Sequence, residues 1–366
     1  MSSPRGRAYP EKFRDERPDY ERDRDRIIHC GAFRRLEYKT QVFVNVEGDY
    51  YRTRLTHSIE AAQISRGIAR RLRLNEQLAE ALALSHDMGH PPFGHAGEDV
   101  LSRLATEASG FEHNYQSLRI VEELEERYPG FPGLNLSWET REGILKHSRG
   151  KPLPSTRRAR ALDPGSLPTL EAQLIDLADE IAYLNHDLDD GIESGLLDEE
   201  RLEAEVPLWK EMLRQVDAEH PGTRGKQRRY NAISRLIGFL VGDLVAQTEA
   251  HVRRAGVETL ADVRAAGAFL AGLSPAADGA RIELKKYLLE NFYKHPQVAA
   301  RLAECTRILE ELYPHYIQAP RLLPASYQRR AESKGLPRAV CDYIAGMTDR
   351  FAMREHERLL GARKSG

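Results

Sequence analysis

The chain has 366 residues, and its 54 Lys and Arg residues nearly balance 56 Asp and Glu residues, for a formal net charge of -2. This balance excludes a polycation, so any contact with phosphate has to come from local arginine clusters. The three cysteines are widely spaced without a CxxC pair, and no apolar run reaches the roughly 18 residues of a membrane span. We therefore expect reduced thiols, a cytoplasmic location and no membrane segment.

Helical spacing of apolar residues dominates the chain after a charged beginning. Residues 1–24 predict a flexible N-terminal arm, and residues 25–366 predict a single domain, since no repeat or sharp boundary divides them. Strand signals are nearly absent, with 40–46 the one plausible extended piece. The predicted fold class is all-α. The predicted helices are 56–73, 77–85, 113–127, 138–147, 170–190, 200–217, 228–253, 259–270, 281–293, 296–312 and 337–359, with basic surface loops at 151–168 and 220–229.

Residues 85–99 concentrate the groups that carry chemistry, with three histidines, two aspartates and a glutamate. The adjacent pair His86 and Asp87 offers an imidazole and a carboxylate to one cation, a mixed set that suits a divalent metal able to activate water. Proline cannot continue a helix, so Pro91 and Pro92 end the one before them. His95 and Glu98 are therefore expected on or just after a turn.

Two ligands cannot hold a metal, and the sequence offers two more. His57 lies one residue inside a helix that Thr56 could cap, and Asp179 lies in an apolar helix where an unpaired carboxylate would be costly. Together with the His-Asp pair they give two imidazoles and two carboxylates, which leaves coordination positions open for water and substrate. Asp179, Tyr183 and Asp187 follow each other at intervals of four residues and so share one helix face.

Five blocks in order carry a resemblance to a known family. They are RRLEYKTQVF at 34–43, RTRLTHS at 52–58, HDMGHPPFGHAGE at 86–98, ADEIAY at 178–183 and DYIAGMTDR at 342–350. Together they resemble the bacterial deoxyguanosine-triphosphate triphosphohydrolase family, within the HD superfamily of metal-dependent phosphohydrolases. The resemblance implies an all-α HD phosphohydrolase fold, with an HD core at about 50–195 and additional C-terminal helices at about 196–366.

The resemblance also implies the reaction. A metal-dependent enzyme of this kind hydrolyses deoxynucleoside triphosphates (dNTPs) to deoxynucleoside and tripolyphosphate, and thereby controls dNTP pools. By similarity, His57, His86, Asp87 and Asp179 hold a divalent metal ion, with Mg²⁺ or Mn²⁺ expected first and other divalent transition metals possible. The histidine pKa suits proton transfer at neutral pH.

Catalytic roles carry over from the same resemblance to three residues. His95 is expected to protonate the leaving 5′ oxygen or relay a proton, and Glu98 is expected to orient it. His113 is a second histidine on the phosphate side. The alternative for Glu98 is that it only begins the next helix, where an acidic residue is favoured.

Substrate-binding roles are also implied. Tyr183 would pack against the deoxyribose and exclude a 2′ hydroxyl, while Asp187 with Gln41 would hold the 3′ hydroxyl. Arg54 would contact the α-phosphate, and Lys285 and Lys286 the distal phosphates. Core packing for Tyr183 and a structural salt bridge for Arg54 remain open alternatives.

Two positions depart from the family pattern, so base preference stays open. Glu180 stands where animal relatives carry a phosphate-contacting lysine, and His90, a further substrate-side residue, stands where some bacterial relatives carry asparagine. His147 and His186 are interpreted as structural.

The resemblance also implies binding partners. They are a dNTP substrate, a second dNTP as a possible activator, possible single-stranded DNA, and further copies of the chain in a homo-oligomer, with a hexamer favoured. Two other functions stay open. One is another HD phosphohydrolase such as a nucleotidase; the other is a regulator that binds nucleotide or single-stranded DNA without hydrolysis.

Overall fold

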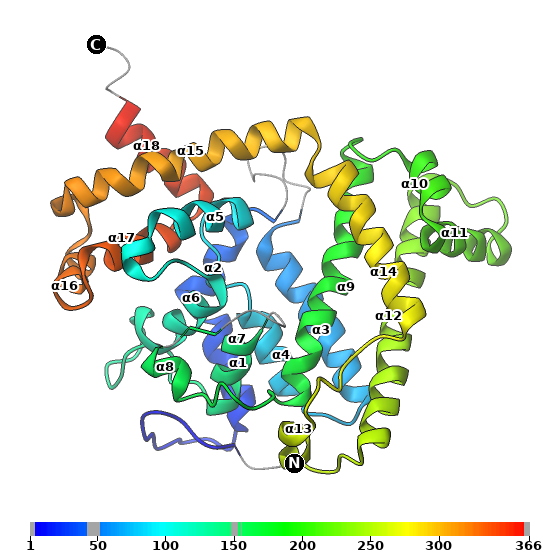
Figure 1. Cartoon of the computed structure of the whole chain (residues 1–366), viewed down its shortest axis with the longest axis horizontal. Coiled ribbons are helices and arrows are strands. Elements are labelled where there is room, and N and C mark those ends of the chain that lie inside the picture. Colours follow the sequence, from blue (N-terminus) through cyan, green and yellow to red (C-terminus); the bar gives the residue numbers. More distant parts are fainter. Residues whose placement is uncertain (1–3, 42–51, 148–152, 155, 362–366) are drawn as a thin grey trace.

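The computed structural model describes residues 4–41, 52–147, 153–154 and 156–361, and within these ranges the chain is helical and forms no β-strand (Figure 1). Three isolated bridges are the β-type pairings there; one of them joins Thr40 to Thr53. The all-α prediction is confirmed, while most of the extended piece predicted at 40–46 lies outside the described residues. No helix of the described part is both long enough and apolar enough to span a membrane.

The elements follow one another with short connections. In chain order they are α1 (Asp19–Ile28), α2 (Gly31–Arg35), η1 (Leu36–Tyr38), α3 (Arg54–Arg71), α4 (Glu76–Ser85), α5 (Gly94–Leu104), η2 (Thr106–Ala108), α6 (His113–Arg119), η3 (Ile120–Leu124), α7 (Trp138–Lys146), α8 (Arg157–Arg160), α9 (Leu170–Glu193), α10 (Glu199–Glu205), α11 (Pro207–Glu219), α12 (Gly225–Ala255), α13 (Leu260–Ala265), α14 (Pro275–Leu288), η4 (Leu289–Tyr293), α15 (Pro296–Gln318), η5 (Pro320–Leu322), α16 (Ala325–Lys334), α17 (Leu336–Ala345) and α18 (Asp349–Leu360).

Helix α9 runs through the middle of the molecule beside α3, with α10 to α12 and α14 on one side and α15 to α18 on the other (Figure 1). Apolar residues on different faces of this 24-residue helix belong to two hydrophobic clusters. Leu174 and Ile181 join the cluster shared with α3, α11 and α12, whereas Ala172 and Ile175 join the cluster of α1, α4 and α7. Burial on both faces fixes the position of α9, because each buried apolar side chain contributes roughly 1.5–3 kcal/mol.

Several helix boundaries differ from the sequence-based expectation for local reasons. The helix predicted at 200–217 is two helices, because Pro207 cannot donate a backbone hydrogen bond within the first one and instead begins the second. The helix predicted at 337–359 also divides, since α17 ends at Ala345 and Thr348 caps α18 by accepting a hydrogen bond from Phe351 N. The prediction of one continuous helix was wrong in both places.

Other differences are smaller. The helix predicted at 259–270 is shorter and ends at Ala265, and the helix predicted at 296–312 is longer and ends at Gln318. The loop predicted at 151–168 contains the short helix α8, and the loop predicted at 220–229 ends where α12 begins at Gly225. The helices predicted at 113–127 and 281–293 each finish in a π-helical turn, η3 and η4.

The N-terminal segment has a defined docking contact on α1. Arg7 donates to the Asp19 carbonyl oxygen at 2.9 Å and pairs with Asp23, whose carboxylate also accepts from Ser137 and Thr140. Helix α1 begins at Asp19, inside the segment 1–24 that was predicted as an arm. The mobility predicted for residues 1–24 stays a prediction.

The fifth sequence block is hydrogen-bonded to two earlier blocks, around Thr40 and around Phe93. Asp349 accepts hydrogen bonds from Thr40 N at 2.8 Å and from Phe93 N at 3.0 Å. Phe93 is buried and has a φ of 65°, in the left-handed region that bulky residues rarely adopt. The hydrogen bond from Phe93 to Asp349 therefore holds the turn that leads into α5.

Close backbone approach at Gly89 gives a stability prediction. A Cβ atom at Gly89 would lie 2.0 Å from His113 O and 2.4 Å from Ser117 N, both backbone atoms, whereas one at Gly67 on α3 would meet nothing within 4 Å. We expect Gly89→Ala to lower the free energy of unfolding by about 2 kcal/mol or more. The matched Gly67→Ala should raise it by roughly 0.5–1 kcal/mol. Urea denaturation measures both, and equal effects would contradict the packing described.

Candidate active site

The four predicted metal ligands converge from three helices. His57 lies in the first turn of α3, His86 and Asp87 follow α4, and Asp179 lies midway along α9. Asp179 Oδ1 is 2.8 Å from His57 Nε2 and 3.4 Å from His86 Nε2. Asp87 Oδ1 is 3.3 Å from His86 Nε2, and its Oδ2 is 3.9 Å from His57 Nε2. These nitrogens and oxygens therefore face one small volume.

The donor atoms at this place fit a divalent cation. His86 Nδ1 is 2.6 Å from the Ala83 carbonyl oxygen, and a carbonyl only accepts, so the proton is on Nδ1 and Nε2 presents its lone pair. That Nε2 atom is buried without a hydrogen-bond partner. Burial by itself lowers the pKa of His86, but the carboxylates of Asp87 and Asp179 raise it to about 9. The carboxylates thus favour positive charge at this position, which a proton on Nε2 would supply in the metal-free protein and a bound cation would supply in its place.

Positive side chains also surround the carboxylate of Asp87. Arg54 is 2% exposed and its Nη1 donates to Asp87 Oδ2 at 2.7 Å. Burial by itself would raise the pKa of Asp87, but the charges of His86 and Arg54 hold it well below its ordinary value. The salt bridge considered for Arg54 is thus present, and contact of Arg54 with an α-phosphate stays a prediction. Thr53, not Thr56, caps α3, and the Thr56 hydroxyl completes the capping box.

Two histidines that were interpreted as structural lie directly behind the ligands. His186 Nε2 is 2.9 Å from His57 Nδ1, and His186 Nδ1 is 2.9 Å from Asp187 Oδ1. Burial and the nearby His57 lower the pKa of His186 to about 3, so its ring is neutral. A neutral Nε2 that accepts from His57 Nδ1 leaves the lone pair of His57 Nε2 free for a metal. The seven-residue spacing from Asp179 to His186, two helical turns, was the available signal.

His147 is the second of these histidines. Its Nδ1 is 2.6 Å from Asp176 Oδ1, and its Nε2 is 3.8 Å from Asp179 Oδ2. His86, His147 and Asp179 together have donor atoms close enough to share a cation. His147 thus lies beside the predicted ligand set, at the end of α7. No sequence signal indicated this contact, because no spacing pattern relates His147 to residues of α9.

The residues predicted for proton transfer form a second cluster. Glu98 lies on α5, and its carboxylate accepts from His113 N at 3.0 Å and from His113 Nδ1 at 2.9 Å. His95 is 67% exposed on its side chain, and its Nδ1 is 3.5 Å from Glu98 Oε2. Burial alone raises the pKa of Glu98, but hydrogen bonds from His113 and His95 hold it well below its ordinary value. Glu98 was expected to orient His95; its closest partner is instead His113.

His90 joins the two clusters. Its side chain is 2% exposed, its Nε2 is 3.2 Å from Asp87 Oδ1, and its ring stacks on His113 with centroids 4.0 Å apart. Burial and the neighbouring Arg54 charge lower the pKa of His90 well below its ordinary value. A neutral ring at this point separates the predicted metal ligands from Glu98.

An aromatic and carboxylate pair lies further along α9. Tyr183 packs edge-on to His57 with centroids 6.5 Å apart, and tilted against Tyr293 at 5.8 Å. Tyr293 donates to Asp187 Oδ2 at 2.5 Å, and burial raises the pKa of Asp187 to about 7. Tyr293, on η4, was not identified from the sequence. The described contacts of Asp187 do not include Gln41, so a shared contact of these two residues with a 3′ hydroxyl stays a prediction.

Two cationic side chains of α14 form ion pairs with a glutamate of α9. Glu180 follows the ligand Asp179 and pairs with both Arg281 and Lys285; Lys285 Nζ is 2.7 Å from Glu180 Oε1. Glu180, which differs from the lysine of animal relatives, therefore provides a carboxylate that pairs with two cationic side chains of α14. Lys286 is exposed on the same helix.

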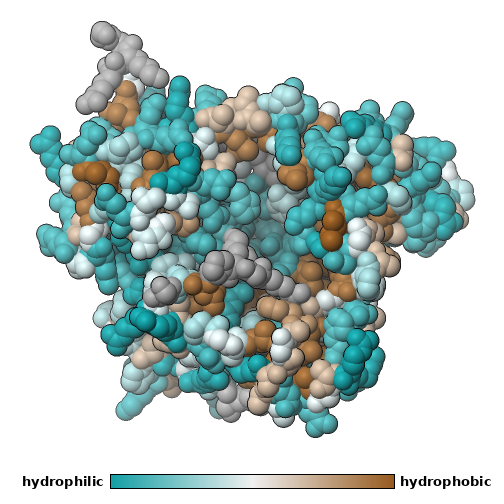
Figure 2. Space-filling view, viewed as in Figure 1, coloured by the Kyte–Doolittle hydropathy of each residue, from teal (hydrophilic) through white to brown (hydrophobic). Residues whose placement is uncertain are grey.

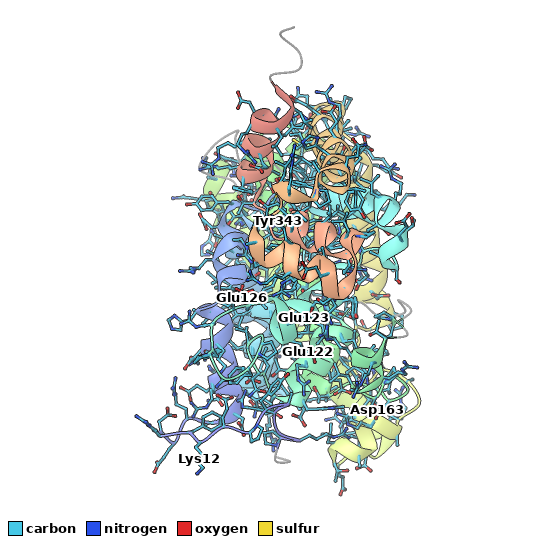
Figure 3. The ribbon with its side chains drawn as sticks, turned by 90° about the vertical axis from the view of Figure 1, so that its left-hand side faces the viewer. Lys12, Glu122, Glu123, Glu126, Asp163 and Tyr343 are labelled. Carbon is cyan, nitrogen blue, oxygen red and sulfur yellow. The ribbon has the colours of Figure 1, made fainter. Side chains whose placement is uncertain are left out.

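The basic segment at 157–160 is partly neutralised. Arg158 pairs with Glu122 at 3.0 Å and with Glu123, two residues of η3 that Figure 3 labels. Arg141 also pairs with Glu122, at 2.8 Å. These ion pairs reduce the positive potential that this segment offers to single-stranded DNA, which stays a predicted partner.

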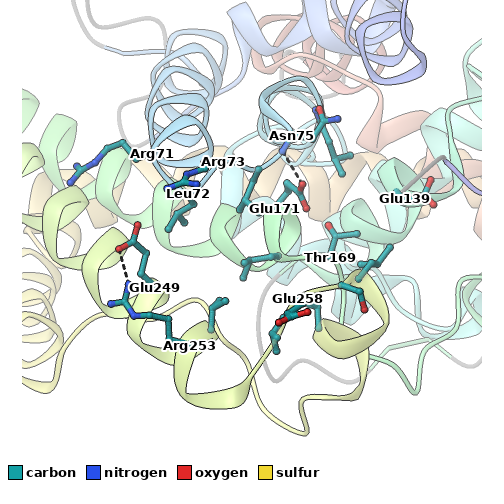
Figure 4. Close-up of a pocket in the computed structure, with 18 of the residues that line it drawn as sticks. Arg71, Leu72, Arg73, Asn75, Glu139, Thr169, Glu171, Glu249, Arg253 and Glu258 are labelled. Atoms are coloured by element: carbon teal, nitrogen blue, oxygen red, sulfur yellow. Dashed lines mark hydrogen bonds and ion pairs between the residues drawn. The ribbon is translucent and has the colours of Figure 1, made fainter. Parts of the chain in front are cut away.

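The surface is hollowed near the middle of the face in Figure 2, with hydrophilic walls, in the region where α5 and α9 approach each other in Figure 1. A separate cavity of about 860 Å³ lies where α4 and α9 begin and α12 ends, and none of the predicted site residues lines it (Figure 4). Its polar groups are already paired in part, since Glu171 accepts from Asn75 N at 3.0 Å and Glu249 pairs with Arg253. We therefore assign the chemistry to the histidine clusters.

Comparison with known proteins gives two family matches and many similar full-length relatives. The sequence pattern of the HD domain family matches residues 54–184, and that of the phosphohydrolase-associated domain matches residues 271–358. The chain is 56% identical to a deoxyguanosinetriphosphate triphosphohydrolase-like protein of Geobacter sulfurreducens, over 97% of this chain and 92% of the relative. Relatives with the same name from Ralstonia nicotianae and Bordetella pertussis are 52% and 51% identical, over 97% and 98% of this chain and 91% and 94% of their own lengths.

Metal removal should destabilise the protein. An ion that binds only the folded chain stabilises it by about 2.7 kcal/mol at one hundred times its Kd. We expect chelation to lower the Tm of the metal-loaded protein by several degrees and Mn²⁺ to restore it, as measured by differential scanning calorimetry. The Tm of His86→Ala should respond clearly less than that of the parent, while that of His220→Ala, a substitution at an exposed histidine, should respond like the parent. An unchanged Tm for the parent protein would contradict a cation site at this place.

The raised pKa of Asp187 gives a pH prediction. Between about pH 4 and pH 7 the unfolded chain loses this proton while the folded chain keeps it, so the stability that Asp187 contributes falls as pH rises. Asp187→Asn replaces the carboxyl with an amide that does not titrate in this range. Its free energy of unfolding relative to the parent should therefore increase across this window, by roughly 1–4 kcal/mol, and level off above it. Urea denaturation at several pH values measures the difference, and a difference independent of pH would count against the assignment.

Proposed function

Since the chain belongs to the HD-domain family of deoxyguanosinetriphosphate triphosphohydrolase-like proteins, we propose that it hydrolyses dNTPs to deoxynucleoside and tripolyphosphate. The family makes the chain a phosphohydrolase, and the substrate and products are the proposal. One observation carries it: the metal-ligand cluster has a histidine and glutamate cluster on one side and an aromatic and carboxylate pair on the other. The three groups would then surround one bound nucleotide and serve its α-phosphate, proton transfer to its leaving oxygen, and its sugar.

The chemistry divides between a cation and the side chains of the chain. A divalent ion held by His57, His86, Asp87 and Asp179 would polarise a phosphoryl oxygen and lower the pKa of a water molecule. Arg54, fixed by Asp87, presents a buried positive charge beside that position and would stabilise charge on the α-phosphate.

Proton transfer falls to the second cluster. As water attacks the α-phosphorus, the bond from phosphorus to the 5′ oxygen breaks, and the leaving oxygen needs a proton. His95 is exposed towards solvent and contacts Glu98, so it is able to bring that proton to a bound substrate. Glu98 is itself fixed by two hydrogen bonds from His113. His113 therefore positions the carboxylate that His95 contacts.

Sugar recognition would use the far end of α9. Tyr183 and Tyr293 form an aromatic corner, and Asp187 accepts from Tyr293 within it. A deoxyribose packed on Tyr183 would leave no room for a 2′ hydroxyl, and Asp187 would accept from the 3′ hydroxyl. Arg281 and Lys285, held by Glu180, would face the distal phosphates.

Two alternatives differ in what they require. A nucleotidase would use the same ligands but release inorganic phosphate. A regulator that binds nucleotide or single-stranded DNA without hydrolysis needs neither an accessible histidine nor a carboxylate beside it, so the contact of His95 with Glu98 favours an enzyme. Activation by a second dNTP, single-stranded DNA binding, a cytoplasmic homo-oligomer, a hexameric state and the choice of Mg²⁺ or Mn²⁺ stay predictions from the resemblance.

Product analysis tests the proposal. The purified protein should convert dNTPs to deoxynucleoside and tripolyphosphate with Mg²⁺ or Mn²⁺, measured by ion chromatography with each dNTP alone and with all four mixed. The mixture allows for activation by a second nucleotide. His86→Ala with Asp87→Ala should reduce turnover at least 1000-fold because water activation is lost, on the order expected for a metal centre, and His220→Ala should not. Inorganic phosphate or pyrophosphate as the product would reject the reaction class.

A further inference from the structure

His90, His95 and Glu98 form a group of potential metal ligands apart from the four ligands of the HD motif. Their donor atoms lie within 4.8 Å of one another. His90 is buried, Glu98 is partly buried and His95 is exposed, so the group has a closed base and an open mouth. That form is typical of a site that a cation reaches from solvent.

The His90 ring is oriented as a metal ligand would be. Its Nε2 atom is 3.2 Å from Asp87 Oδ1, and because a carboxylate only accepts, the proton of His90 is on Nε2. Nδ1 then presents a lone pair, and this buried atom has no hydrogen-bond partner. Histidine ligands generally donate their other ring N–H to a carboxylate in this way.

The unpartnered nitrogen faces further donors. His90 Nδ1 is 3.9 Å from Glu98 Oε2, and the same oxygen is 3.5 Å from His95 Nδ1. A first-row ion with bonds of about 2.0–2.2 Å to nitrogen and oxygen holds its tetrahedral ligands roughly 3.3–3.6 Å apart. The separation of His95 Nδ1 from Glu98 Oε2 lies in this range. That of His90 Nδ1 from Glu98 Oε2 exceeds it by a few tenths of an ångström, which a small rotation of the Glu98 carboxylate would remove.

We propose that His90 Nδ1, His95 Nδ1 and Glu98 Oε2 form a second divalent-metal site. Two imidazoles and one carboxylate favour Zn²⁺, Co²⁺ or Ni²⁺ over Mg²⁺, which prefers oxygen ligands. Three protein ligands leave at least one coordination position open. Asp87 links the two sites, since it faces the first cation with one oxygen and hydrogen-bonds His90 of the second.

A cation in this site would change activity. This consequence rests on the proposed function, in which His95 and Glu98 serve the leaving oxygen. A metal ion bound to both would fix His95 and occupy Glu98, so nitrogen-preferring ions would inhibit turnover once the second site fills. The site itself depends only on the ligand geometry.

Metal stoichiometry tests the site without turnover. Metal-free protein is prepared by chelation and gel filtration, dialysed against micromolar Co²⁺, and analysed for bound metal by mass spectrometry and for Co²⁺ by visible absorption. We expect two Co²⁺ per chain for the parent and for His220→Ala. His95→Ala and Glu98→Ala should each bind one, with the second affinity at least tenfold weaker. His57→Ala combined with His86→Ala should also keep one, in the second site.

Each outcome decides the proposal. His95→Ala removes an exposed side chain, so a folding defect is not expected, and its far-ultraviolet circular dichroism checks this. One Co²⁺ in the parent, or two in both His95→Ala and Glu98→Ala, would overturn the second site. Because no nucleotide is present, a failure of the proposed reaction leaves this result unchanged, and failure here leaves the reaction untouched.

Discussion

The structure depends on bringing two carboxylates and two imidazoles from three helices into one buried volume. Asp87 and Asp179 would repel each other there without positive charge between them, and Arg54 supplies only part of it. Packing makes the arrangement rigid. Helix α9 is buried on two faces, against α3 and against α4 and α7, so Asp179 cannot retreat from His57 and His86. The hydrophobic core thus fixes a charge arrangement that a cation would complete.

Neighbouring polar groups contact three of the predicted ligand side chains and so orient them. His186 faces His57, the Ala83 carbonyl faces His86, and His147 stands beside Asp179. The same principle extends to the neighbouring cluster, where Asp87 orients His90 and His113 holds Glu98. The two clusters share Asp87, so a change in one is expected to reach the other.

The sequence predicted the all-α class, the main helices and the residues that converge, because helical periodicity and the motif blocks are local signals. It did not predict the role of His147, His186 or Tyr293, since their contacts with α9 or α3 depend on tertiary packing. It also assigned Glu98 to His95, three residues away, whereas the closest partner is His113, which follows α5 after the turn at Ser109 and Gly110. Two local signals indicated the helix breaks: Pro207 itself, and the sequence Gly-Met-Thr directly after Ala345. Because the apolar periodicity continues across both places, it predicted one continuous helix in each.

In the proposed reaction, water attacks the α-phosphorus while His95 serves the leaving 5′ oxygen. The most direct measurement is to run the reaction in water labelled with oxygen-18 and to analyse both products by mass spectrometry. Attack at phosphorus places the label in tripolyphosphate and leaves the deoxynucleoside unlabelled. Label in the 5′ hydroxyl of the deoxynucleoside would mean attack at carbon and would contradict the account.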